Sequence, residues 1–498
     1  MSHHIPQGTL MGHPKGLFLL FTTEMWERFS YYGMRALLVL TLVAATDAAN
    51  PGFGMTTAEA LKLYAYYTSL VYLTPIIGGW LADTFIGQRR AVVLGGALMS
   101  AGQFTLFVAT PHSLSLFYVG LGLMIIGNGF FKPNISTMVG DLYDQGDARR
   151  DSAFSIFYMG INLGAFIAPL ICSTLGEDPA WGWRYGYLAA GIGMALSVVI
   201  QLLFAQRFLG DVGLEAGAKR SLAASGGVKQ PLTKVEIDRL RVILTLFIFV
   251  VMFWLAFEQA GGLMNIFAQD NTQRMVGTFE VPAGWFQSLN AMFILIFAPL
   301  FSILWIKLNK IDKNPDAPIK IVAGLILTAI GFGFLVAGIF EMQTTGDGKA
   351  TMIWLVLAYL FHTLGELCIS PVGLSLMTKL APMRLASLVM GIWFLMPALA
   401  QLLGGLIGAY SERAGEYQAV RHFAEGLGIR AEDAGILVIF GSIALFLCLF
   451  AVVLWLISGK LVVWMHGAEK GAPANTGQAL SEEMEVVGDH EAMRKSHQ

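Results

Sequence analysis

Long apolar stretches alternate with short polar segments along most of the chain. Each stretch has about 20 residues or more, the length that a helix needs to cross a bilayer core of about 30 Å. The pattern therefore predicts an all-α integral membrane protein with twelve transmembrane helices. We expect them at residues 16–45, 57–82, 90–109, 115–139, 152–175, 184–207, 240–266, 283–308, 318–340, 351–379, 385–410 and 434–459.

One polar segment, residues 210–239, divides the twelve helices into two sets of six. Two such halves around a basic linker are typical of the major facilitator fold, in which a central site lies between two bundles. The segment GGWLADTFIGQRR (78–90) resembles the cytoplasmic loop signature of that superfamily, in which Asp83 can interact with a neighbouring helix end. We expect an N-terminal six-helix bundle at 1–209, a cytoplasmic linker at 210–239, a C-terminal six-helix bundle at 240–464 and a polar cytoplasmic tail at 465–498.

Composition excludes a soluble protein and says little about partners. The chain is 55% hydrophobic and only 13% charged, with a mean hydropathy of +0.63, whereas soluble domains carry about 25% charged residues. Cys172, Cys368 and Cys448 all lie in apolar stretches, so we expect them to pack without forming a disulfide. We expect a lipid bilayer around the chain, no nucleic-acid partner, no cofactor and a monomer.

Basic residues in the connections predict the orientation. They gather in every second connection, at Arg89, Arg90, Arg149, Arg150, Lys219, Arg220, Lys229, Lys234, Lys307, Lys310, Lys313, Lys379 and Arg384. The connections between them carry few, except the last one, 412–430. Because cytoplasmic loops carry an excess of Lys and Arg, we expect a multi-pass protein of the cell membrane with both termini cytoplasmic.

The first predicted helix carries an unusual set of charges, in TEMWERFSYYGMR (23–35). Glu24, Arg28, Tyr31 and Arg35 recur at spacings of three and four and share one face, with Glu27 beside it. Each charge would cost about 2.5–3.5 kcal/mol at the bilayer centre if it faced lipid. These side chains must therefore pair with one another along a water-accessible pathway, and they are too many for a purely structural ion pair.

Charged residues in other helices provide partners. Lys132 lies deep in the fourth helix, where Gly127, Gly129 and Pro133 should make it accessible, and it requires a carboxylate such as Glu24 or Glu27. In the seventh helix, Glu258 can balance Arg35.

The tenth helix carries Glu366, before Pro371 and Gly373, which should distort the helix. His362 lies four residues before Glu366, a spacing that would suit a metal. Because no third ligand is apparent, we expect no metal site, and we expect His362 to be solvated or packed near the helix end.

Several motifs together resemble one family. EMWERFSYYGMR is similar to the E-x-x-E-R-F-x-Y-Y motif of the proton-dependent oligopeptide transporter (POT) family, and FFKPNIST (130–137) and FYMGINLGA (157–165) resemble its two signatures. FWLAFEQAGG, QSLNAMFILIFAPL, GELCISPVGLS and GIWFLMPALAQLLGG also match. The resemblance implies a symporter, not an enzyme, that imports di- and tripeptides with protons by alternating access.

The resemblance also implies roles for individual residues. It assigns proton coupling to Glu24, Glu27, Arg28, Lys132 and Glu258, and an interbundle gate to Arg35 and Glu258. Arg35 and Lys132 would attract the peptide carboxylate, and Glu366 would hold its ammonium group. The other implied substrate-binding residues are Asn162, Asn290 and Ser370, with Tyr31, Tyr32, Tyr67, Tyr158 and Trp393 as pocket walls.

Two alternatives remain open. A transporter of nitrate or another small anion would share the fold, but a carboxylate such as Glu366 beside an anion site would be costly. A membrane-embedded hydrolase would need a nucleophile–base pair or a metal cluster, and neither is apparent.

Two features depart from the family. The linker is too short and polar for the two extra helices of some bacterial members, and the connection at 411–433 is long and predicts an amphipathic surface helix around YQAVRHFAEGLG.

Overall fold

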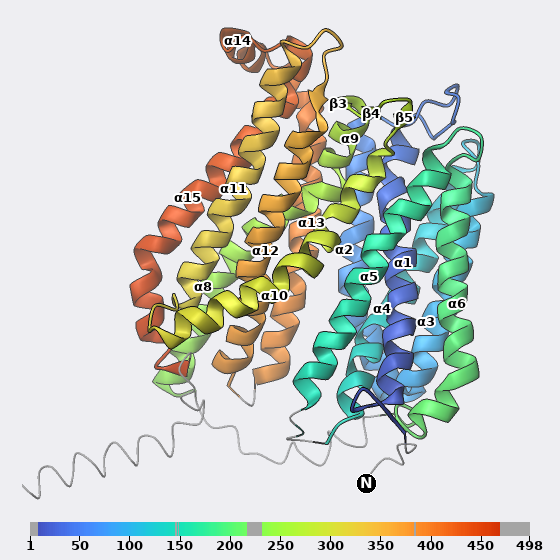
Figure 1. Ribbon diagram of the computed structural model, residues 1–498, viewed down its shortest axis with the longest axis vertical. Coiled ribbons are helices and arrows are strands. Elements are labelled where there is room, and N and C mark those ends of the chain that lie inside the picture. Colours follow the sequence, from blue (N-terminus) through green and yellow to red (C-terminus); the bar gives the residue numbers. More distant parts are fainter. Residues whose placement is uncertain (1–7, 145–146, 148, 217–231, 383–384, 469–498) are drawn as a thin grey trace, which may run out of the picture.

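The computed structural model describes residues 8–144, 147, 149–216, 232–382 and 385–468. Within them it contains twelve helices of at least 21 residues, which run side by side (Figure 1). These are α1 (Lys15–Val43), α2 (Thr57–Leu81), α3 (Gln88–Val108), α4 (Leu114–Asp141), α5 (Arg149–Glu177), α6 (Trp183–Leu209), α8 (Lys234–Phe257), α10 (Ser288–Lys310), α11 (Ala317–Met342), α12 (Met352–Leu380), α13 (Ala386–Glu416) and α15 (Ala434–Trp464).

Short elements complete the fold. A π-helix, η1 (Ala82–Ile86), extends α2, and the 3-10 helices η2 (Glu258–Gly261), η3 (Ala283–Gln287) and η5 (Ala431–Asp433) precede or follow longer helices. The helices α9 (Leu263–Asp270) and α14 (Gln418–Gly426) are short. One two-stranded antiparallel sheet, β1 (Thr9–Leu10) with β2 (His13–Pro14), precedes α1. Two more lie in the connections of the second bundle: parallel β3 (Thr272–Gln273) with β6 (Ala350–Thr351), and antiparallel β4 (Met275–Val276) with β5 (Phe279–Glu280).

A long helix lies at each of the twelve predicted positions, with one correction. Ten helical segments in the described chain are long and apolar enough to cross a membrane. The seventh predicted helix, 240–266, is not one helix, because it is interrupted at Glu258–Gly262, between α8 and α9. It also begins earlier than predicted, at Lys234. A Cβ atom at Gly261 would collide with the Tyr64 hydroxyl and lie 2.5 Å from Nε of Arg35, so only a glycine fits where the chain departs from the helix. By contrast, α12 continues through Pro371 without a break.

The long helices form two bundles, α1–α6 and α8–α15 (Figure 1). In the first bundle α1 packs against α5 and α6, and in the second α11 packs against α12 and α15. The bundles meet along two pairs of helices, α2 with α13 and α5 with α10. We call the end where α1 begins and α15 finishes the terminal end, and the opposite end the distal end (Figure 1).

Glycines allow the closest helix contacts of the first bundle. A Cβ atom at Gly78 of α2 would collide with the backbone of Gly129 in α4, and one at Gly127 would lie 2.6 Å from the carbonyl oxygen of Gly95 in α3. Gly78, in the 78–90 segment, therefore lets α2 approach α4 closely. Gly127 and Gly129 pack α4 against its neighbours, so their role differs from the access to Lys132 that we expected.

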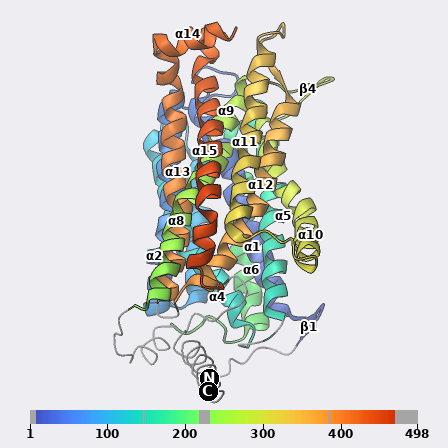
Figure 2. The same ribbon diagram turned by 90° about the vertical axis from the view of Figure 1, so that its left-hand side faces the viewer.

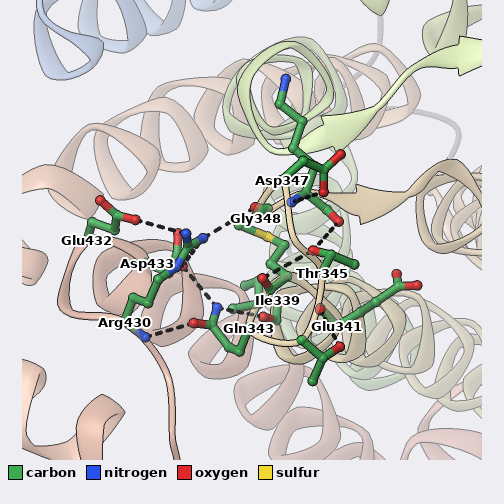
Figure 3. A network of polar contacts seen from close by, with 12 residues as sticks. Ile339, Glu341, Gln343, Thr345, Asp347, Gly348, Arg430, Glu432 and Asp433 are labelled. Atoms are coloured by element: carbon green, nitrogen blue, oxygen red, sulfur yellow. Dashed lines mark hydrogen bonds and ion pairs between the residues drawn. The ribbon is translucent and has the colours of Figure 1, made fainter.

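A polar network closes the distal end of the second bundle (Figure 3). Arg430 forms an ion pair with Asp433 at 2.9 Å, and its backbone N–H donates to Oε1 of Gln343 at the end of α11. Gln343 in turn donates from Nε2 to Asp433 at 3.0 Å. These contacts anchor the long connection between α13 and α15, where the predicted amphipathic helix is confirmed as α14, lying across the bundle end (Figure 2).

Candidate functional site

The charges of α1 form a compact buried cluster. Nε of Arg28 lies 3.0 Å from Oε1 of Glu24 and 2.5 Å from Oε2 of Glu27, while Nδ2 of Asn128 on α4 donates to Oε1 of Glu27 at 3.3 Å. The three ionic side chains are at most 6% exposed. Helical spacing turns Glu24 and Arg28 to the same face, so the predicted pairing within α1 is confirmed. Oε2 of Glu24 and Nη2 of Arg28 are buried and have no hydrogen-bond partner in the described chain.

Lys132 departs from the expected arrangement. It makes no ion pair with any carboxylate of the described residues, so the direct contact that we predicted with Glu24 or Glu27 is wrong. Its Nζ lies over the ring of Tyr72 on α2, 4.2 Å from the centroid. The quadrupole of an aromatic face attracts a cation, which explains how the ammonium is held there. Lys132 still interacts electrostatically with Glu24, Glu27 and, across the bundle interface, Glu258.

Arg35 and Glu258 join the two bundles. Nη2 of Arg35 lies 2.5 Å from Oε2 of Glu258, with both side chains at most 7% exposed, and Nε of Arg35 donates to the Tyr64 hydroxyl at 2.8 Å. The interruption after α8 places Glu258 at the start of η2, opposite the distal half of α1. The predicted pairing of Arg35 with Glu258 is confirmed, and its role as a gate remains a prediction.

Glu366 lies in the second bundle and faces the first. Nδ2 of Asn290 on α10 donates to Oε2 of Glu366 at 2.9 Å and also approaches Oγ1 of Thr363 at 3.1 Å. Glu366 is buried, and its charge interacts with Tyr32 and Tyr158 of the first bundle. Acidic Glu366 on α12 therefore lies in electrostatic range of the aromatic residues that flank the cationic side of the site.

The predicted aromatic wall residues differ in environment. Tyr31 and Tyr67 are almost fully buried, and their hydroxyls have no hydrogen-bond partner among the described residues. Tyr32 packs edge to face against Tyr31, with centroids 5.3 Å apart, and Tyr158 is 44% exposed. Trp393 is half-buried and lies so close to Gly373 that a Cβ atom there would be 2.7 Å from its ring.

Two further predicted residues make only local contacts. Asn162 is buried and donates from Nδ2 to the Tyr158 carbonyl in its own helix at 2.9 Å. Ser370 is half-buried, and its hydroxyl has no partner among the described residues.

Four contact residues were not predicted from the sequence: Tyr64, Tyr72, Asn128 and Thr363. A signal was present for three of them. Asn128 precedes Lys132 by four residues, Thr363 precedes Glu366 by three and Tyr64 precedes Tyr67 by three, so each pair shares a helix face. Tyr72 lacked such a signal, because its contact with Lys132 depends on how α2 crosses α4.

We expected His362 to be either solvated or packed, near the helix end. It is packed, but it does not lie near the end of its helix. It lies in the first half of α12, is 2% exposed and packs against the Phe332 ring with centroids 4.7 Å apart. In the described part of the chain, no group of three His, Cys, Asp or Glu side chains could hold a metal ion.

Further hydrogen bonds join the bundles from the middle of the molecule towards the distal end. Nδ2 of Asn265 donates to the Ala36 carbonyl at 2.8 Å, and Oγ of Ser288 donates to the Phe166 carbonyl at 2.8 Å. Ala36 lies in the distal half of α1, and Phe166 lies in the distal half of α5. Together with Arg35 and Glu258, these contacts close the distal side of the site.

Two helical bundles with buried, opposite charges between them define a multi-pass membrane transporter of the major facilitator type. A model of the POT family matches residues 89–218 and 220–420, more than half of the chain. This protein therefore belongs to the POT family, whose members are transporters and not enzymes.

Relatives and solved structures agree with that family. The chain is 36% identical over 486 residues to a di-/tripeptide transporter of Lactococcus lactis subsp. cremoris, which covers 86% of this chain and 95% of that protein. It is 37% identical over 465 residues to the peptide transporter YePEPT of Yersinia enterocolitica, covering 82% of this chain and 90% of the relative. A crystal structure of a peptide transporter POT in complex with sulfate has a TM-score of 0.80 and 34% identity, covering 93% of this chain and 98% of that one.

Proposed function

We propose that this protein imports di- and tripeptides together with protons by alternating access. The observation that carries the proposal is the buried charge set between the bundles, with Arg35 and Lys132 on one side and Glu366 on the other. A zwitterionic peptide needs a cationic and an anionic partner, and here the first bundle supplies the cations Arg35 and Lys132 while the second supplies the carboxylate Glu366. The relatives that are named as peptide transporters match more than four fifths of the chain, which supports the same substrate class.

Peptide binding follows from these two poles. The peptide carboxylate binds Lys132 and Arg35, and its ammonium group binds Glu366, which Asn290 orients at 2.9 Å. Asn162 and Ser370 supply further polar contacts. Tyr31, Tyr32, Tyr67, Tyr158 and Trp393 wall the side-chain space, where broad aromatic contacts accept varied side chains.

Proton coupling follows from the charge balance. The proposed site contains four carboxylates, Glu24, Glu27, Glu258 and Glu366, and three cations, Arg28, Arg35 and Lys132, so it carries one negative charge in excess when all seven are ionised. One bound proton makes the site neutral, and a zwitterionic peptide then adds no net charge. Protonation of Glu24 or Glu27 weakens its bond to Arg28, and protonation of Glu258 releases Arg35, so either event biases the two bundles towards another opening.

The energy of one proton is sufficient for accumulation. A proton that moves down a potential of 100 mV provides about 2.3 kcal/mol, and each unit of pH difference adds about 1.4 kcal/mol.

The conformation described here is closed at the distal end, so we assign it to the state that opens towards the cytoplasm.

We further propose that the terminal end is cytoplasmic and that one chain is the transport unit. The described basic residues Arg89, Arg90, Arg149 and Arg150 lie in the first turns of α3 and α5, which begin at the terminal end, as the distribution of Lys and Arg in membrane proteins predicts. The proposed site is built from a single chain.

Labelling of a His112→Cys variant in intact cells by an impermeant maleimide tests the orientation, because His112 lies in the distal loop before α4. Absence of labelling would reverse the assignment.

Uptake into proteoliposomes tests the function. Purified protein is reconstituted, and accumulation of a labelled dialanine peptide is measured with and without an inward proton gradient. We expect concentrative uptake only with the gradient, competition by unlabelled dipeptides and no competition by nitrate. Uptake that ignores the gradient would remove the coupling, and competition by nitrate alone would favour an anion transporter.

A Lys132→Ala variant separates coupling from binding. We expect it to exchange peptide across the membrane without a gradient but to lose gradient-driven accumulation. Concentrative uptake at the normal level in this variant would contradict the role of Lys132.

A further inference from the structure

The first turn of α2 is completed by the other bundle. Thr56 caps this helix and accepts the N–H of Glu59, whose carboxylate accepts the Thr56 N–H in return. This capping box leaves the N–H groups of Thr57 and Ala58 without a partner inside the first bundle. Glu412, near the end of α13, accepts both of them, at 2.9 Å from Thr57 to Oε1 and 3.2 Å from Ala58 to Oε2.

The same arrangement recurs where α5 meets the start of the span 283–310. Pro282 precedes this span and provides no side-chain cap. The N–H groups of Ala283 and Gly284 donate to Glu177 at the end of α5, at 2.6 Å to Oε2 and 2.8 Å to Oε1. A Cβ atom at Gly284 would collide with Oγ of Ser173 on α5, so a glycine lets the span approach this closely.

The two contacts are counterparts within the fold. In each, a carboxylate at the distal end of the fifth long helix of one bundle accepts two N–H groups where a helical segment of the other bundle begins, the first turn of α2 in one case and η3, which leads into α10, in the other. A negative charge at a helix N-terminus is stabilised by the unpaired N–H groups and the helix dipole. Arg274 of the second bundle adds an electrostatic attraction for Glu177.

We propose that Glu177 and Glu412 are the distal gate residues of the transport cycle, each holding the bundles together by capping a helix of the opposite bundle. The proposal rests on alternating access as the proposed function. When the distal end opens, both carboxylates lose their backbone donors and the helix starts are left to water. The two caps therefore stabilise only the distally closed state. Glu177 is half-buried and Glu412 is exposed, so water competes more strongly for Glu412 and its cap is the weaker one.

Distance measurements between spin labels test the gate without any substrate. Labels are placed at His112→Cys and Gly346→Cys, two exposed distal positions on opposite bundles, after Cys448→Ala removes the exposed native thiol. We expect Glu177→Gln to raise the ratio of distally open to closed molecules about tenfold, which corresponds to about 1.4 kcal/mol. For Glu412→Gln we expect about a threefold rise, and the double variant should show the product of both.

A donor-side variant and a matched control complete the test. Thr57→Pro removes one N–H group at the first position of α2, where proline is well tolerated because Thr56 already has an extended backbone with ψ of 154°. It should shift the ratio in the same direction as Glu412→Gln, and the combination of both should add little. Glu416→Gln, one turn further along α13 and also exposed, should leave the ratio unchanged.

Unchanged distances in both Glu177→Gln and Thr57→Pro would overturn the gate assignment, as would an equal shift in Glu416→Gln. These distances are recorded without peptide or a proton gradient. The gate assignment can therefore be refuted while peptide uptake is observed, and peptide uptake can be absent while the expected shifts in distance are observed.

Discussion

Removing the carboxylate of Glu258 should strongly disfavour the conformation described here. Arg35 is at most 7% exposed, and in a Glu258→Gln variant it would lose its only directly paired carboxylate among the described residues while keeping its hydrogen bond to Tyr64. Breaking a buried ion pair by removing one partner costs about 3–5 kcal/mol, because the remaining charge stays uncompensated. Since the glutamine retains one acceptor, we expect a cost near the lower limit, about 3 kcal/mol, which corresponds to a change of about 100-fold in an equilibrium constant.

The spin-label pair at His112 and Gly346 measures this change directly. The ratio of distally open to closed molecules should rise about 100-fold in Glu258→Gln, since Arg35 becomes hydrated when the bundles separate. In the double variant Arg35→Gln with Glu258→Gln neither charge of this pair remains, so no partner is left uncompensated. Its ratio should return to within about tenfold of the wild-type value, which gives a large coupling energy in the double-mutant cycle.

Two results would refute this reasoning. A change smaller than about threefold in Glu258→Gln would mean that Tyr64 and water compensate Arg35 fully. Additive effects of the two single changes would mean that the pair contributes no interaction energy to the closed state, despite its distance of 2.5 Å.

Three further predictions concern binding, packing and pH. Glu366→Gln should raise the KM for dialanine about 10- to 100-fold, because the peptide ammonium group loses a charged hydrogen bond. Inhibition by N-acetylated dialanine, which has no ammonium group, should not change. Equal losses of affinity for both compounds would contradict the role of Glu366. Gly78→Ala should lower the thermal unfolding temperature, because its Cβ would collide with the Gly129 backbone, whereas Gly122→Ala, with open space around it, should not. Hydrogen bonds from the Lys349 N–H and the Gln273 amide lower the pKa of Asp347 in the folded protein. This carboxylate therefore stabilises the fold at pH values above the ordinary aspartate pKa of about 3.9. The stabilisation is lost as the pH falls through the folded-state pKa. The difference in unfolding temperature between wild type and Asp347→Asn should therefore disappear at the acid end of a pH series, and a constant difference would refute it.

Local patterns were sufficient for the helices and for contacts within one helix. The length of the apolar stretches determined the twelve membrane helices to within a few residues at most ends, because the bilayer sets the length of a span. Spacing on one helix placed Glu24 with Arg28, since residues four apart are neighbours whatever surrounds the helix. The same reasoning failed at Gly261, where contact with Tyr64 and Arg35 from another bundle accompanies the break in the helix.

The sequence by itself determined the class of protein, the charged face of α1 and the family resemblance, because hydropathy, helical periodicity and motifs are all properties of neighbouring residues. Only the tertiary structure placed Lys132 over Tyr72 instead of against Glu24, and it alone brought Glu177 and Glu412 to helix starts in the opposite bundle. These contacts join residues that are from 60 to more than 350 positions apart. They depend on the crossing of helices and on the relative position of the two bundles, which no local spacing encodes.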